Sequence, residues 1–204
     1  MRVTHARPAI APPAREHRTE DSGGLTRQEL YRSAFGGSVS ALAGAAYPSI
    51  YAHELGHKLA VDTLYQNAQP TIEVNPFSGG VTRWFPGELT ETGQKLGPRL
   101  SRAVVSAAGT VVDTTIAMTS FAVGYRIRKE HPLIGTTLMG YAGFTMLNSV
   151  FYAASALGSA VTPGNDFASL ALNAGIHPLV SMGILAAVLP AEYLLLRTLE
   201  KHGI

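Results

Sequence analysis

The chain has 204 residues, of which 46% are hydrophobic and only 15% are charged, whereas roughly 25% charged residues are typical of soluble domains. The formal net charge of +2 is too small to indicate a nucleic-acid-binding protein. The absence of cysteine excludes disulfides and thiolate metal sites. Most charged residues fall in three blocks, at residues 1–32, 62–102 and 126–130, and the long, nearly uncharged segments between them predict membrane spans.

Residues 1–24 mix Arg, Pro, His and acidic residues, and this composition predicts a disordered N-terminal tail. An organelle-targeting segment is the alternative, although Glu16, Glu20 and Asp21 are unusual in one. Residues 25–204 are predicted to form one membrane-embedded domain.

The first predicted elements of the domain are an amphipathic approach helix at residues 25–33 and an apolar helix at residues 34–65. The apolar helix is rich in Gly, Ala and Ser, which let helices approach closely in lipid. Pro48 is expected to kink it. Residues 71–75 and 81–85 then alternate like strands around a Gly-rich turn, which predicts a β-hairpin, followed by a loop over residues 87–98.

Three further spans are predicted within residues 103–125, 132–161 and 175–196, each near the roughly 20 residues that a helix needs to cross a bilayer. The predicted fold class is therefore an all-α membrane protein with about four transmembrane helices and a short β-hairpin after the first. The predicted location is an integral, multi-pass membrane protein surrounded by membrane lipid, with no nucleic-acid partner.

The motif that indicates chemistry is His53-Glu54-Leu55-Gly56-His57, which fits the pattern H-E-x-x-H. On a helix, residues four apart share a face, so both imidazoles can bind one Zn²⁺ ion. Glu54 lies beside them and is the predicted catalytic base, which takes a proton from an attacking water. An ordinary helix with two surface histidines is the alternative, but His, Glu and His are costly in an apolar segment unless they serve a purpose.

A catalytic zinc site usually has three protein ligands, so a third must come from elsewhere in the chain. Thr63 stands where the metzincin motif would have its third histidine. Asp166 is the predicted third metal ligand, since it lies between apolar segments with no basic residue near it in sequence. The alternatives are that Asp166 caps the helix that follows, and that Glu73 in the hairpin is the ligand.

These features together resemble the site-2 protease family of intramembrane zinc metalloproteases, over about residues 35–170. HELGH within a membrane helix has that family's form, and residues 106–117 (SAAGTVVDTTIA) are similar to its second-span pattern of Ala-Gly-Pro followed by Asn. The hairpin and Asp166 fall where the family has a membrane-associated hairpin and its third ligand. The resemblance implies one Zn²⁺ ion and a membrane-protein substrate.

The chain also departs from the family pattern. Thr110 replaces the Pro, Asp113 replaces the Asn, and Phe167 follows Asp166 where the family usually has Gly. Asp113 could line a water path to the metal or form a hydrogen bond with a neighbouring helix. Asn148 could position substrate or join two helices.

The leading functional hypothesis is an intramembrane zinc endopeptidase that cleaves a membrane-spanning substrate by metal-activated water. One alternative is a soluble or peripheral H-E-x-x-H zinc peptidase whose apolar segments form a buried core. Another is a non-catalytic membrane protein that has a zinc site. Substrate-binding residues are not assigned by the sequence.

Overall fold

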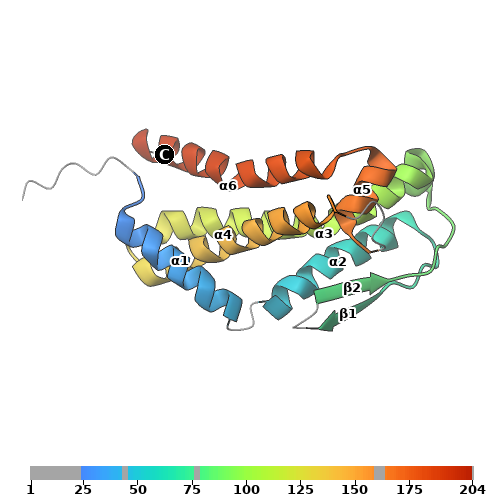
Figure 1. Cartoon of the computed structure of the whole chain (residues 1–204), viewed down its shortest axis with the longest axis horizontal. Coiled ribbons are helices and arrows are strands. Elements are labelled where there is room, and N and C mark those ends of the chain that lie inside the picture. Colours follow the sequence, from blue (N-terminus) through green and yellow to red (C-terminus); the bar gives the residue numbers. More distant parts are fainter. Residues whose placement is uncertain (1–23, 43–45, 76–78, 159–163, 204) are drawn as a thin grey trace, which may run out of the picture.

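The computed structural model describes residues 24–42, 46–75, 79–158 and 164–203 (Figure 1). The described part is mostly helical, at 76%, with one small antiparallel sheet, as the predicted fold class requires. Apart from Gly24, the predicted tail lies outside the described residues. The elements in chain order are α1 (Arg27–Leu42), α2 (Ala46–Leu64), β1 (Thr71–Asn75), β2 (Gly79–Arg83), α3 (Glu91–Ile127), α4 (Pro132–Ser155), α5 (Asp166–Ala174) and α6 (Pro178–Lys201).

The boundary predicted between residues 33 and 34 is wrong, because α1 continues through it to Leu42 and α2 begins at Ala46. Pro48 therefore lies in the first turn of α2 and does not kink a helix interior. The first turn tolerates proline because its backbone N–H groups have no partner within the helix.

The predicted hairpin is present, with β1 at its predicted bounds and β2 two residues earlier than predicted. Val74 pairs with Gly80 in the antiparallel register. The loop predicted at residues 87–98 is wrong from residue 91 onward, because α3 begins at Glu91 after a cap in which Gly93 N donates to Thr90 Oγ1. Gly97, with φ of 80°, interrupts the helix just before Pro98.

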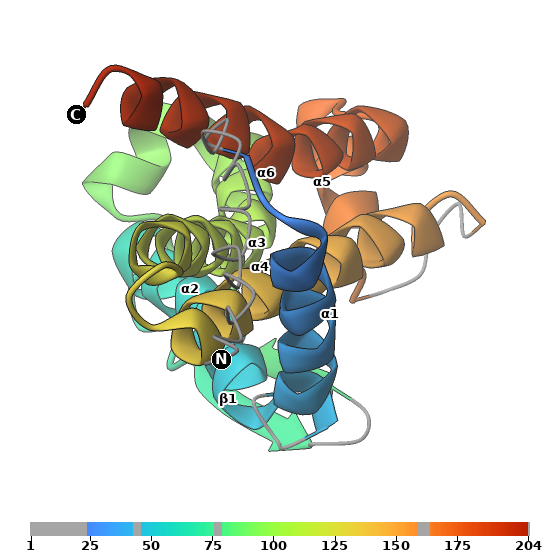
Figure 2. The ribbon, with the colours of Figure 1, turned by 90° about the vertical axis from the view of Figure 1, so that its left-hand side faces the viewer.

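Helix α3 is the centre of the arrangement and packs against α2, α4, α5 and α6, while α1 packs against α4. Figure 1 shows α3, α4 and α6 running along the long axis of the molecule, with the hairpin beside α2. Figure 2, turned by 90°, shows α6 and the hairpin on opposite sides of the other helices. Elements far apart in sequence thus converge on α3.

Two helices of the described part, α3 and α6, are long and apolar enough to cross a membrane, where the sequence predicted about four. Of the helices at the other predicted spans, α2 contains His53, Glu54, His57 and Lys58, and α4 has Gly, Thr and Ser between its apolar residues. In α3 and α6 only 28% and 17% of the apolar window is buried. Both helices also keep large apolar side chains exposed, such as Val111 and Met118 in α3 and Ile184 and Leu194 in α6.

The contact between α1 and α4 depends on glycine at position 140. A Cβ atom there would overlap the carbonyl oxygen of Ser33 and would lie 2.5 Å from Gly37 N. Such a contact forces the helices apart, because backbone atoms cannot rotate away as a side chain can.

We expect Gly140→Ala to destabilise the folded protein by about 1–3 kcal/mol, the usual cost of overpacking. Thermal unfolding in detergent would measure the effect as a lower midpoint. Gly143→Ala is the matched control on the same helix, because no atom lies within 4 Å of its added Cβ. Equal unfolding midpoints for the two variants would contradict the close packing of α1 on α4.

Candidate active site

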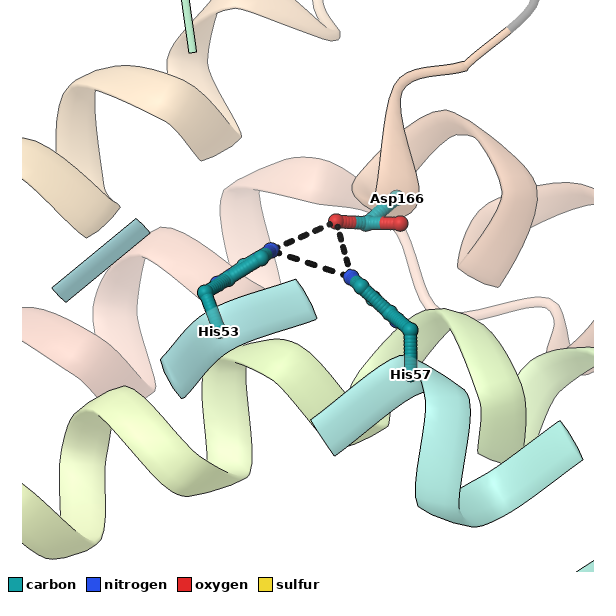
Figure 3. Close-up of side chains that lie close together, drawn as sticks. All are labelled: His53, His57 and Asp166. Carbon is teal, nitrogen blue, oxygen red and sulfur yellow. Dashed lines mark hydrogen bonds and ion pairs between the residues drawn. The ribbon is translucent and has the colours of Figure 1, made fainter. Parts of the chain in front are cut away.

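Three predicted ligand residues converge at one point between α2 and the start of α5 (Figure 3). The Nε2 atoms of His53 and His57 are 3.0 Å apart. Asp166 Oδ2 lies 3.3 Å from His53 Nε2 and 3.2 Å from His57 Nε2. The i, i+4 spacing on α2 brings the two rings together, and the chain returns 109 residues after His57 to add the carboxylate.

The spacing of these donor atoms fits a zinc ion. Zinc–ligand distances of 2.0–2.2 Å in a tetrahedron imply ligand–ligand distances of about 3.3–3.5 Å. The three observed separations, 3.0–3.3 Å, are close to that value. Two imidazoles and one carboxylate are also a donor set that catalytic zinc sites use, with a fourth position left open. The residues could therefore hold a metal ion of this kind.

Asp166 does not cap α5, because the neighbouring Asn165 does. Asn165 Oδ1 accepts hydrogen bonds from Phe167 N at 2.9 Å and Ala168 N at 3.1 Å. The Asp166 carboxylate is thus left to face the histidines, and Tyr152 Oη lies 3.3 Å from its Oδ2 atom. The alternative of Asp166 as the cap was wrong by one residue.

The second nitrogen of each imidazole also has a partner. His53 Nδ1 lies 2.7 Å from Asp113 Oδ2, and His57 Nδ1 lies 2.6 Å from the carbonyl oxygen of Val105. A carboxylate and a carbonyl accept hydrogen bonds, so each Nδ1 carries the proton and each Nε2 has a free lone pair for a metal. Asp113 thus forms the interhelical hydrogen bond that the sequence left open.

The absence of a side chain at Gly109 leaves space for the two imidazoles against α3. A Cβ atom there would lie 2.5 Å from His57 Nε2 and 2.6 Å from His53 Nε2. On the facing helix, a Cβ at Gly56 would lie 2.7 Å from the Ala108 carbonyl oxygen. A side chain at position 56 would push α2 from α3, because it meets backbone, whereas one at position 109 would displace the two imidazoles themselves.

The carboxylate of Glu54 is held by the hairpin. Glu54 is only 5% exposed, and its Oε2 atom accepts a hydrogen bond of 2.7 Å from the hydroxyl of Thr82 in β2. Gly80, two residues earlier on the same strand face, leaves space for the carboxylate, because a Cβ there would lie 2.8 Å from Glu54 Oε1. The strand therefore fixes Glu54 beside the histidines.

Glu73, the alternative third ligand, lies elsewhere. It pairs with Arg83 across the hairpin, with Oε2 3.1 Å from Nε, and its side chain is 60% exposed. Among the described residues, the group close enough to share one metal ion comprises His53, His57 and Asp166.

Two clefts flank the three ligand residues. The larger, of about 520 Å³, lies between α2 with β2 and the facing side of α4. The smaller, of about 270 Å³, lies between β2, α3 and the start of α5. Both clefts are lined by Glu54, Gly80 and Tyr152. The carboxylate of Glu54, the candidate catalytic group, therefore lies where the two clefts meet.

The sequence did not identify several residues of this site, namely Thr82, Gly109 and Tyr152. One signal was present: polar side chains recur along α4 at helical spacing, at Tyr141, Thr145, Asn148 and Tyr152. All four line the larger cleft. Asn148 therefore lies in the wall of the larger cleft.

No family model matches the chain, and the searches of curated proteins and of solved structures found no match either. The chemistry that the site can perform is therefore inferred from its residues and their distances.

We expect Asp113→Ala to weaken zinc binding by about 10–100-fold, because the partner that orients His53 and raises its basicity is removed. Asp113→Asn retains an acceptor without the charge, so its loss should be smaller. Competition with a chromophoric chelator on detergent-purified protein measures both affinities.

Thr115→Ala is the control on the same helix, since its exposed hydroxyl donates only to the Val111 carbonyl. Wild-type affinity in both Asp113 variants would mean that the hydrogen bond to His53 has no effect on metal binding.

Proposed function

We propose that this protein is an intramembrane zinc metalloendopeptidase, similar to the site-2 protease family, that cleaves a membrane-spanning substrate. The observation that supports the proposal is the convergence of His53, His57 and Asp166 within hydrogen-bonding distance, with Glu54 buried beside them. A structural zinc site is normally closed by four protein ligands, whereas three ligands and an adjacent carboxylate are typical of catalytic sites.

Glu54 is the proton acceptor in this proposal. Its carboxylate takes a proton from the water that attacks the peptide carbonyl, and the leaving nitrogen is protonated when the C–N bond breaks. The hydrogen bond from Thr82 to Oε2 holds the group in place and leaves Oε1 on the side of Gly80. A bound zinc ion would supply Lewis-acid polarisation of the carbonyl and a lower water pKa.

Strand β2 is suited to bind an extended substrate. It pairs with β1 along one edge, and among the described residues no other strand pairs with it. Gly79 and Gly80 line the larger cleft, and Val81 and Thr82 line the smaller one, so the strand passes both sides of Glu54. A locally unwound substrate could add as a third strand, with main-chain hydrogen bonds supplying affinity.

Four membrane spans remain part of the proposal. Helices α3 and α6 are apolar and keep large apolar side chains exposed, among them Val111 and Ile184. Polar side chains of α2 and α4, such as His53, Tyr141 and Thr145, line the larger cleft. A polar inner face and an apolar outer face are compatible with a multi-pass membrane protein.

The soluble zinc peptidase and the non-catalytic zinc protein each predict features that differ from those of the structure. A soluble peptidase would cover its apolar helices, whereas Val111 and Ile184 are 60% and 61% exposed. A non-catalytic zinc protein has no use for a buried carboxylate that β2 holds next to the ligands. Both alternatives are therefore less well supported than the intramembrane peptidase.

We expect Glu54→Gln to retain zinc but to lower cleavage of a co-reconstituted single-span substrate by at least about 10²–10⁴-fold, since glutamine cannot accept the proton. Metal content and cleavage must be measured on the same preparation. Asp166→Ala is the contrasting variant, because it should lose both zinc and activity. Unchanged cleavage by Glu54→Gln would exclude the proposed mechanism, and full zinc occupancy in Asp166→Ala would exclude Asp166 as a ligand.

We expect the protein to stay in the membrane pellet after an alkaline carbonate wash, because the uncovered apolar faces of α3 and α6 need lipid or detergent. A known peripheral protein in the same membranes should be released and serves as the control. Recovery of a soluble monomer without detergent would instead favour the soluble zinc peptidase.

A further inference from the structure

The two clefts beside the candidate catalytic group differ in chemistry as well as in size. The larger cleft is lined mainly by aromatic, aliphatic and hydroxyl side chains of α2 and α4. The smaller cleft is lined by polar residues from several elements, including Ser106, Asn165 and Ser169, and by Arg102. A substrate that crosses Glu54 would therefore meet different surroundings on the two sides of the cleaved bond.

Arg102 is a cation without a carboxylate partner among the described residues. Three nearby basic residues have one, as Lys58 pairs with Asp62, Arg83 with Glu73, and Lys95 with Glu91, whereas Arg99 donates to the carbonyl of Leu172 and lines neither cleft. Burial raises the pKa of the nearby Tyr65 hydroxyl, and the positive charge of Arg102 acts in the opposite direction. The guanidinium thus keeps donors for an anionic group.

The position of Arg102 also indicates what that group is. Arg102 is the last basic residue of α3 before the apolar stretch that begins at Ala103 and continues to Tyr125. It therefore lies at the end of a candidate membrane span, where the polar flanking residues of a single-span substrate would also lie. Guanidinium groups bind carboxylates through two parallel hydrogen bonds, which gives both strength and selectivity.

We propose that the smaller cleft is a specificity subsite in which Arg102 binds an acidic side chain of the substrate, Asp or Glu, close to the cleaved bond. The inference depends on the proposed peptidase function and names the substrate class for it. Glu54 and Asp166 border the same cleft, so Arg102 lies close enough to the candidate catalytic group to contact a substrate side chain near the cleaved bond.

The test uses a co-reconstituted single-span substrate in which Glu, Gln or Lys is introduced in turn at each position that flanks the cleaved bond. The wild-type protein should cleave the best-placed Glu substrate with a kcat/KM about 10-fold or more above that of its Gln counterpart, as expected for a charge-assisted hydrogen bond. Arg102→Glu should invert the order, so that the Lys substrate is preferred. Arg102→Gln should remove the preference without inverting it.

Arg99→Glu is the matched control. Arg99 lies on the same helix, is exposed, and donates to the carbonyl of Leu172 without lining either cleft. Its preference for Glu should therefore equal that of the wild type.

Equal cleavage of Glu, Gln and Lys substrates by the wild type would overturn the subsite while leaving the peptidase function intact. The same preference in Arg102→Glu as in the wild type would overturn it as well. Failure of the wild type to cleave any substrate would instead refute the peptidase function on which the subsite depends. Because each comparison is a ratio within one preparation, a partly misfolded variant does not imitate an inverted preference.

Discussion

The close crossing of α2 and α3 is the constraint on which the rest of the site depends. Gly56 on one helix and Gly109 on the other remove the side chains that would separate them. At this separation the carbonyl of Val105 and the carboxylate of Asp113 can both reach the imidazoles of α2. The same two glycines thus determine the distance between helices, the protonated nitrogen of each histidine and the direction of the free lone pairs.

Asp166 reaches the two histidines because hydrogen bonds hold the start of α5 in place. Asn165 caps α5 and forms a hydrogen bond of 3.0 Å to Ser155 at the end of α4, while Tyr152 contacts both the carboxylate and the backbone N–H of Asp166. Since α4 and α5 both pack on α3, the histidines and the carboxylate are supported by one central helix. A ligand set supported in this way is preorganised for a metal ion.

The hairpin positions the side chain that is the proton acceptor in the proposed function. Through Thr82 and Gly80 it holds Glu54, and it is also the wall common to both clefts. In the proposed function one strand therefore aligns the substrate backbone and positions the group that takes the proton. This arrangement links specificity to catalysis, because a shift of β2 would alter the position of Glu54 as well as the shape of the smaller cleft.

The sequence by itself determined the local features of this protein. The i, i+4 spacing of His53 and His57 needs only helical periodicity, and the alternation at residues 71–75 needs only the period of a strand. Asp166 was predicted because an isolated carboxylate between apolar segments is costly. Tertiary structure alone decided that Asp113 faces His53, that Gly109 makes room for both rings, and that Arg102 lies in the smaller cleft. These facts join residues from different helices, and no local period or propensity specifies which faces of two helices meet.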